Sequence, residues 1–134
     1  MIQACSHLVI AAKDVECMQM FFEQLFEVAP YFSNSEFCEF VLPNQFRLAF
    51  FKPVGKAAQF FSNPKERSQV SYGVTVLNIE ATYQKALALK LRVSGEPKDH
   101  PWGEKSFLVI DAEENRWEIT QSPSKNGMLV NLHP

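Results

Sequence analysis

An internal repeat is the feature of this sequence that most constrains its fold. The apolar run of residues 6–12 is typical of a buried strand, and Asp14 follows it where the N-cap of an amphipathic helix is expected. The run 70–76 is followed by Asn78 in the same way, a shift of 64 residues from Asp14. A single unit of roughly 60 residues leaves one face of its sheet open, so two copies must bury surface between them.

Each repeat continues with short β-rich runs separated by turn residues. These runs are EVAPYF, EFCEFVL and FRLAFF in the first repeat and LRVSGEPK, SFLVID and RWEITQ in the second. The order predicts an α+β fold with two tandem βαβββ modules in a single domain. The expected boundaries are 5–52 for module one, 53–69 for a linker, 70–121 for module two and 122–134 for a C-terminal tail.

Composition and charge exclude several classes of function. The chain has 134 residues and a formal net charge of -2, so it offers no basic field for nucleic acid. No apolar run approaches the roughly 20 residues of a membrane span, and the N-terminus lacks the basic start of a signal peptide, so we expect a cytoplasmic protein. Its three cysteines form no CxxC pair, which argues against a disulfide framework or a cysteine-rich zinc site.

Two stretches resemble a known family. The segment PWGEKSFLVIDAEENRWEITQ is similar to the PWGxRxFxxxDPxGNxxEL segment of the vicinal oxygen chelate superfamily. That superfamily includes glyoxalase I, the bleomycin resistance proteins, fosfomycin resistance enzymes and extradiol dioxygenases. The front segment HLVIAAKDVECMQMFFEQLF and the two βαβββ halves extend the resemblance over nearly the whole chain. Ala112 and Glu114 replace the usual Pro and Gly of the DPxGN turn, whereas Asn115, which tolerates positive φ, remains.

The resemblance implies that the sheets of both modules curl around one cleft. It also implies metal ligands on the first and last strand of each module, and the corresponding positions here are His7, Leu48, Ser71 and Glu118. His7 and Glu118 suit a divalent metal such as Zn, Ni, Mn or Fe, whereas Leu48 cannot coordinate and a neutral serine is a poor ligand. Half of the implied metal site is missing, so we expect no resident cofactor.

Side-chain alternation along the strands predicts which residues line the cleft. If Leu8 and Ile10 face the first helix, His7 and Val9 face the other way. The predicted lining comprises His7, Val9, Leu48, Phe50, Ser71, Gly73, Thr75, Glu118 and Thr120. This lining is apolar on the module-one side and rich in hydroxyls on the other, which is typical of a small-molecule pocket.

Several residues have more than one interpretation. His7 and Glu118 form either a metal pair completed by water or substrate oxygens, a hydrogen-bonding pair that orients a ligand, or ordinary solvated residues. Trp102 is predicted to stack on a ligand in the pocket wall, with His100 beside it as a potential acid or base, and the alternative is a plain surface turn.

Two other features keep open interpretations. The adjacent Phe60 and Phe61 in the polar linker form a lid, a dimer contact or simple packing of the linker onto the core. Glu36 and Glu39 alternate with phenylalanines on a predicted strand, and one of them is a replacement ligand if it points into the cleft.

Two hypotheses for function follow. The first is a binding protein similar to bleomycin resistance proteins, which sequesters an aromatic or amphipathic small molecule without turning it over. The second is a divalent-metal-dependent lyase or dioxygenase similar to glyoxalase I, a lactoylglutathione lyase, in which His7 and Glu118 hold the metal. A homodimer is expected in both cases, because relatives cover exposed sheet edges and aromatic faces by pairing.

Overall fold

The computed structural model describes residues 1–61 and 70–121. The chain divides into two compact units, 1–66 and 67–134, which contain the first and the second repeat. We call them module one and module two. The predicted C-terminal tail and the second part of the predicted linker, residues 62–69, lie outside the described residues.

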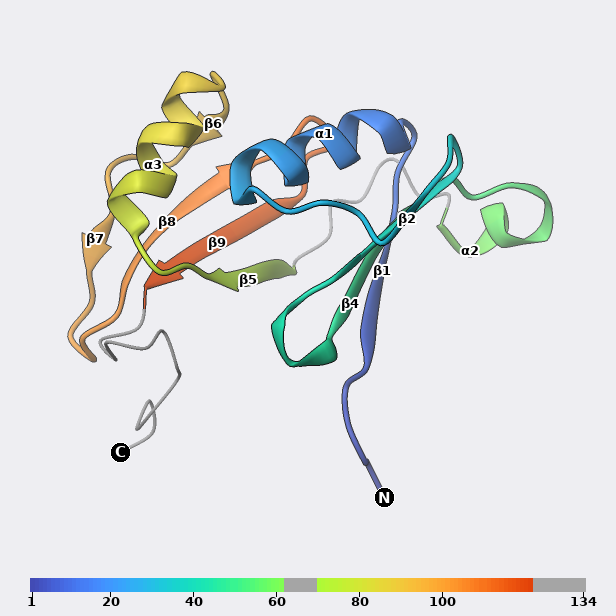
Figure 1. The fold of residues 1–134 in the computed structure, drawn as a ribbon, viewed down its shortest axis with the longest axis horizontal. Helices are drawn as coiled ribbons and strands as arrows, with labels where there is room; N and C mark the ends of the chain where they lie inside the picture. Colours follow the sequence, from blue (N-terminus) through green and yellow to red (C-terminus); the bar gives the residue numbers. More distant parts are fainter. Residues whose placement is uncertain (62–69, 122–134) are drawn as a thin grey trace. The chain divides into compact units, whose positions relative to one another are not determined.

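Module one contains a βαβββ unit in which helix α1 packs on a four-stranded sheet (Figure 1). Its elements are β1 (His7–Ala11), α1 (Val15–Phe26), β2 (Phe32–Ser33), β3 (Phe37–Val41) and β4 (Arg47–Phe51). The strand order is β1-β4-β3-β2, with β1 parallel to β4 and the remaining pairs antiparallel. The helix α1 is the crossover that a parallel connection requires.

Helix α1 starts and packs as its sequence predicts. The side chain of Asp14 accepts a hydrogen bond of 3.0 Å from the Cys17 backbone N–H, which caps the first turn. The apolar side of the helix lies on the sheet, where the ring of Phe22 packs 4.7 Å from that of Phe40 and 6.1 Å from that of Phe50. An aromatic cluster therefore forms the core of module one.

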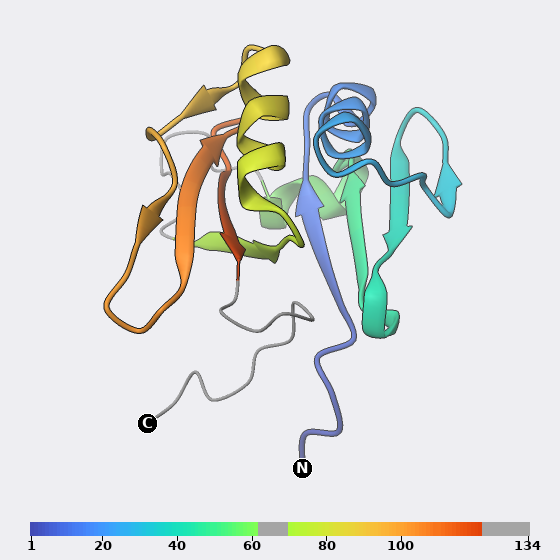
Figure 2. The same ribbon diagram turned by 60° about the vertical axis from the view of Figure 1, so that its left-hand side comes forward.

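Module two repeats this connectivity with one strand more. Its elements are β5 (Ser71–Thr75), α3 (Ile79–Ala88), β6 (Arg92–Val93), β7 (Lys98–Asp99), β8 (Lys105–Ile110) and β9 (Arg116–Gln121). The order is β5-β9-β8-β6, and β7 pairs with the other end of β8. The run LRVSGEPK, expected as one strand, forms the short β6 and the start of β7, separated by Gly95 at positive φ. In each module the helix lies along one face of its own sheet (Figure 2).

A buried carboxylate anchors module two. Asp111 is 2% exposed and accepts a hydrogen bond of 2.8 Å from the Trp117 indole N–H. It also accepts from the backbone N–H groups of Glu113 and Asn115 and from the Asn115 side chain. These bonds close the turn before β9, and Glu114 rather than Asn115 adopts positive φ there.

The first part of the predicted linker is ordered against module one. A 3₁₀ turn, η2 (Gly55–Ala57), leads into the short helix α2 (Ala58–Phe61). The ring of Phe61 packs edge-on to Phe51 with centroids 4.9 Å apart, whereas Phe60 is 82% exposed. Simple packing therefore explains Phe61 but not Phe60. No described helix is long and apolar enough to cross a membrane.

Candidate ligand-binding faces

Each sheet has one face against its own helix and an opposite face, which we call the distal face of that module. Paired residues on neighbouring strands point to the same side of a sheet. In module one, His7 pairs with Arg47, Val9 pairs with Ala49, and Ala49 in turn pairs with Glu39. These five side chains therefore share the distal face of module one.

The pairing corrects the prediction for Leu48 and Phe50. Leu48 pairs with Leu8 and Phe50 pairs with Ile10, so both point toward α1 and are buried in the core. They cannot line a site on the same face as His7. The run FRLAFF is apolar on both sides, so its sequence did not indicate which residues face the helix, and a shift of one residue inverts every side chain.

The register also identifies the module-one residue that corresponds to Glu118. Val9 pairs with Ala49, and its repeat equivalent Gly73 pairs with Glu118. The equivalent of Glu118 is therefore Ala49, not Leu48. Alanine offers no donor atom either, so module one still lacks a metal ligand on its last strand.

His7 belongs to a polar cluster on the distal face of module one. Its Nδ1 lies 2.7 Å from the Ser6 hydroxyl and 3.4 Å from a guanidinium nitrogen of Arg47. The other terminal nitrogen of Arg47 lies 3.6 Å from the Glu39 carboxylate. A guanidinium can only donate, so we assign Nδ1 of His7 as an acceptor and Nε2 as the N–H donor of the neutral ring.

The distal face of module two carries the residues that strand alternation predicts. Ser71, Gly73 and Thr75 of β5 pair with Arg116, Glu118 and Thr120 of β9. The residues of this face are thus Ser71, Gly73, Thr75, Arg116, Glu118 and Thr120, together with Ser106 and Leu108 of β8.

Glu118 stands on this face with room beside it. Its carboxylate is exposed and makes no hydrogen bond or ion pair with any other described residue. A Cβ built on the neighbouring Gly73 would meet no atom within 4 Å. Beyond Glu118, the hydroxyls of Thr75 and Thr120 lie 3.0 Å apart. The face therefore combines a carboxylate, open space and a pair of hydroxyls.

His100 and Trp102 lie at the edge of the same face. The Nε2 of His100 is 2.6 Å from the Ser106 hydroxyl, and Ser106 pairs with Thr120. The imidazole also stacks on the Trp102 indole, with ring centroids 4.6 Å apart and planes 5° apart. Trp102 is 58% exposed. The side chains of this loop are therefore fixed by contacts, because His100 stacks on Trp102 and also contacts the Ser106 hydroxyl.

Sequence reasoning missed Arg47 and Ser106 as neighbours of the predicted residues. The signal for Arg47 was that an arginine begins the last strand of each module, Arg47 in β4 and Arg116 in β9. Ser106 would have been found from alternation along β8 once its pairing with Thr120 was known.

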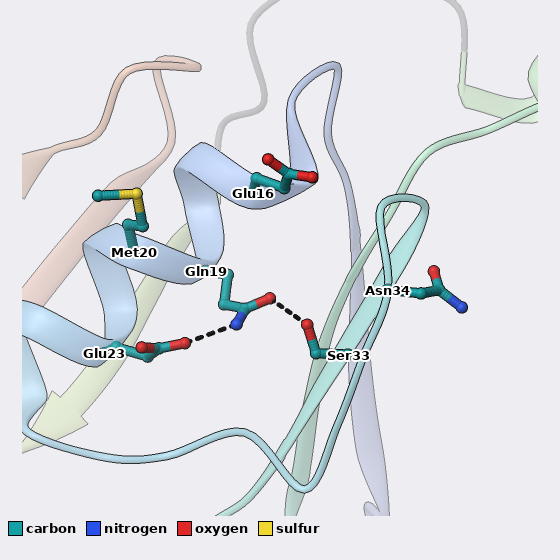
Figure 3. Close-up of a pocket in the computed structure, with 6 residues that line it drawn as sticks. All are labelled: Glu16, Gln19, Met20, Glu23, Ser33 and Asn34. Carbon is teal, nitrogen blue, oxygen red and sulfur yellow. Dashed lines mark hydrogen bonds between the residues drawn. The ribbon is translucent and has the colours of Figure 1, made fainter.

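A separate hollow of about 370 Å³ lies on the helix side of module one, between α1 and β2 (Figure 3). It is lined by Glu16, Gln19, Met20, Glu23, Ser33 and Asn34. The Gln19 amide bridges two of these residues, because it donates to Glu23 and accepts from the Ser33 hydroxyl, each at 2.6 Å. None of the predicted site residues lines this hollow.

Comparison with known proteins places the chain in a family. The sequence model of the Glyoxalase/Bleomycin resistance protein/Dioxygenase superfamily matches residues 4–119. The chain belongs to this superfamily. A search of curated proteins found no significant match.

Solved structures of the superfamily share the fold. A glyoxalase-related enzyme from Fulvimarina pelagi matches with a TM-score of 0.74 and 20% identity over 91% of this chain and 90% of that one. The fosfomycin resistance protein FosX from Listeria monocytogenes matches with a TM-score of 0.71 and 16% identity over 96% and 100%. Lactoylglutathione lyase from Agrobacterium tumefaciens matches with a TM-score of 0.64 and 18% identity over 89% of this chain and 93% of that one. Identities this low show a common fold and leave the activity open.

The superfamily implies a divalent metal, and one FosX structure contains Mn(II). The residues of this chain do not fit such a centre. Within either module, no group of three or more described His, Cys, Asp or Glu side chains lies close enough together to hold a metal ion. Ser71 and Ala49 occupy two of the implied ligand positions, and the Nδ1 of His7 is engaged by Ser6 and faces a cationic guanidinium. We therefore derive no chemistry from a metal.

Proposed function

We propose that this protein binds an aromatic or amphipathic small molecule on its distal sheet faces and does not turn it over. The observation that carries the proposal is the exposed Glu118 carboxylate beside open space at Gly73. An acceptor-only group next to a gap and a pair of hydroxyls suits a ligand with hydrogen-bond donors.

Module one presents donors on its own distal face. The Nε2–H of His7 and the guanidinium of Arg47 are donors on its distal face, whereas Glu39 balances the charge of Arg47. In this proposal His7 and Glu118 orient a ligand by hydrogen bonds, and neither needs to coordinate a metal. The apolar side chain of Val9, 40% exposed, supplies contact area for an aromatic or aliphatic part of the ligand.

A ligand screen with matched variants tests the proposal. Aromatic and amphipathic compounds are screened by quenching of tryptophan fluorescence, and each hit is titrated against wild type, Glu118→Gln and Glu96→Gln. Glu118→Gln keeps the shape and removes the charge, so affinity should fall by roughly tenfold or more, whereas exposed Glu96 should not matter. Equal affinity for all three proteins, or no hit at all, would contradict the proposal.

The second candidate is a metal-dependent lyase or dioxygenase. It is supported by His7 and Glu118, which stand on the first strand of module one and the last strand of module two, where the superfamily resemblance implies metal ligands. This candidate requires stoichiometric binding of Zn, Ni, Mn or Fe that Glu118→Gln abolishes.

A homodimer also stays a prediction. The edge strand β2 exposes Phe32 at 51%, and the adjacent Tyr31 is exposed at 76%. Pairing of two copies would remove such a surface from water. Light scattering during size-exclusion chromatography should give twice the chain mass, and a monomer mass would contradict the prediction.

A further inference from the structure

The distal face of module one has a polar end and an aromatic end. Side chains two residues apart on a strand share a face, so Arg47, Ala49 and Phe51 of β4 all point to the distal side. Arg47 lies beside His7 at one end of the strand, and Phe51 lies beside Phe37 at the other. Both ends are built on β4, which is paired on either side, so the strand fixes their spacing.

Aromatic rings gather at the second end. Phe61 of α2 packs edge-on against Phe51 with ring centroids 4.9 Å apart, and the ring of Phe32 in β2 lies 6.1 Å from that of Phe37. Phe32 pairs with Glu39, which places it on the distal face as well. Phe32 is 51% exposed and Phe61 is 49% exposed. This end therefore keeps apolar surface in contact with water.

Arg47 at the polar end has more donors than its neighbours use. A guanidinium carries five N–H donors. Among the described residues, its polar contacts are the Glu39 carboxylate at 3.6 Å and Nδ1 of His7 at 3.4 Å. Both distances exceed the roughly 2.8 Å of a good charge-assisted hydrogen bond, and the Arg47 side chain is 45% exposed. The cation is thus held in place by its neighbours but not saturated by them.

The spacing of the two ends sets the length of a ligand that contacts both. Phe51 follows Arg47 by four positions, and a strand rises about 3.3 Å per residue, so their Cα atoms lie roughly 13 Å apart. Val9 pairs with Ala49 halfway between them and is 40% exposed. A matching ligand has a head that complements a cation, an apolar body of several bonds and an apolar tail.

We propose that the distal face of module one binds an amphipathic organic carboxylate lengthwise. The carboxylate accepts hydrogen bonds from one edge of the Arg47 guanidinium, because the two planar groups match. The body of the ligand crosses Val9, and its tail packs on the rings around Phe51. The Glu39 carboxylate competes for Arg47 and limits the affinity. This inference deepens the proposed function, on which it rests, by naming the charge of the ligand and the order of its parts.

Two probes of nearly equal shape test the charge. 4-Phenylbutanoate and neutral 4-phenylbutanamide are titrated into the full chain at neutral pH and followed by ¹H–¹⁵N NMR. The backbone signal of Val9 and the side-chain Nε–H of Arg47 should shift, whereas the indole N–H of buried Trp117 in module two is the internal control. Wild type should bind the carboxylate roughly tenfold more tightly than the amide, as expected for hydrogen bonds to a charged group.

Substitutions of the two neighbouring charges should act in opposite directions. Arg47→Gln removes the cation and should abolish the preference for the carboxylate. Glu39→Gln keeps the shape and removes the competing anion, so the carboxylate should bind roughly threefold more tightly while the amide is unaffected. A residue that served only the stability of the fold would not produce these opposite effects on one probe alone.

Two further variants serve as controls. Arg92→Gln makes the same change as Arg47→Gln on an exposed arginine of module two, and it should alter neither affinity. Phe61→Ala removes apolar surface from the aromatic end, so it should weaken both probes alike and leave the preference for the carboxylate unchanged.

An unchanged preference in Arg47→Gln would overturn the inference, and so would weaker or unchanged binding of the carboxylate in Glu39→Gln. Shifts confined to module two, or no binding of either probe at millimolar concentration, would overturn it as well. Each of these outcomes leaves the proposed function standing, because the ligand screen with Glu118→Gln tests that function separately. Equal affinities in that screen would contradict the proposed function whatever the two probes show.

Discussion

The two modules share connectivity and differ in what their distal faces present. On module one, His7 is joined to Arg47 and Glu39 in a charged cluster next to apolar Val9. On module two, Glu118 stands among hydroxyls and has no described partner. The first face carries His7, Arg47 and one carboxylate, whereas the second carries Glu118 and Arg116 among hydroxyls, so the repeat has kept its fold and diverged in its surface chemistry.

The cores of the two modules also differ, one being apolar and the other built around a buried polar group. Module one is held by a cluster of phenylalanines around Phe22, with distances typical of aromatic packing. Module two is held by Trp117 and the buried carboxylate of Asp111. One copy therefore depends on apolar contact, and the other depends on a satisfied polar network.

The largest expected effect comes from breaking that network. Asp111→Ala leaves the Trp117 indole N–H and two backbone N–H groups without acceptors, so the free energy of unfolding should fall by about 3–5 kcal/mol. Urea unfolding followed by tryptophan fluorescence measures it. Asp99→Ala removes an exposed carboxylate and should cost less than about 1 kcal/mol. Similar losses in both variants would show that Asp111 is not the anchor.

The next effect concerns Cys38, a titratable reporter inside module one. Burial raises the pKa of the Cys38 thiol to about 11, from about 8.5 for a free thiol. The unfolded chain releases this proton first, so the free energy of unfolding should fall as the pH rises from about 8.5 to about 11. Cys38→Ala should flatten the decline over that range.

The same shift governs thiol reactivity. Exposed Cys5 and Cys17 should react with a thiol reagent at pH 8, whereas buried Cys38 should react roughly 100-fold more slowly or only on unfolding. The count of reactive thiols before and after adding denaturant measures this. Three fast thiols in the folded protein would show that module one opens readily.

A fourth prediction restores a lost ligand position in module two. Ser71 is the repeat equivalent of His7 and shares a face with Glu118. Ser71→His should raise Zn affinity by roughly tenfold or more, because it adds a nitrogen donor near a carboxylate. Isothermal titration calorimetry measures the gain, and adding Glu118→Gln to this variant should remove it. A gain that survives the second substitution would place the metal elsewhere.

The smallest expected effect lies in the turn before β9. Glu114 has a φ of 70°, where side chains are strained, so Glu114→Gly should relieve that strain. The variant also loses the exposed bond of 2.9 Å to Arg92. The free energy of unfolding, measured by thermal unfolding, should therefore rise by about 0.5 kcal/mol. Arg92→Ala isolates the cost of the lost bond, and a clear loss in Glu114→Gly would mean that the bond outweighs the strain.

The fold could be predicted from the sequence because the repeat is clearest in the first strand and the helix of each module. Asp14 and Asn78 cap equivalent helices, and His7 and Ser71 begin equivalent strands at the expected shift of 64 residues. Helix caps and apolar periodicity are local signals, so they can be read from a single chain.

The candidate site was predictable only in part. On the last strands the shift grows to 69 residues, from Arg47 to Arg116, because the modules differ in loop length. The apolar run around Leu48 gave no alternation to fix the face, which explains the error there. The contact of His100 with Ser106 depends on how a loop folds back on a strand, and no local pattern encodes that.

We propose that His7 and Glu118 bind a ligand by hydrogen bonds and not through a metal. The most direct test is the metal content of the purified protein, followed by calorimetric titration of wild type and Glu118→Gln with Zn, Ni, Mn and Fe(II). We expect no stoichiometric metal and no difference between the two proteins. One ion bound per chain, or per pair of chains, and lost in Glu118→Gln would contradict it and favour the metal-dependent enzyme.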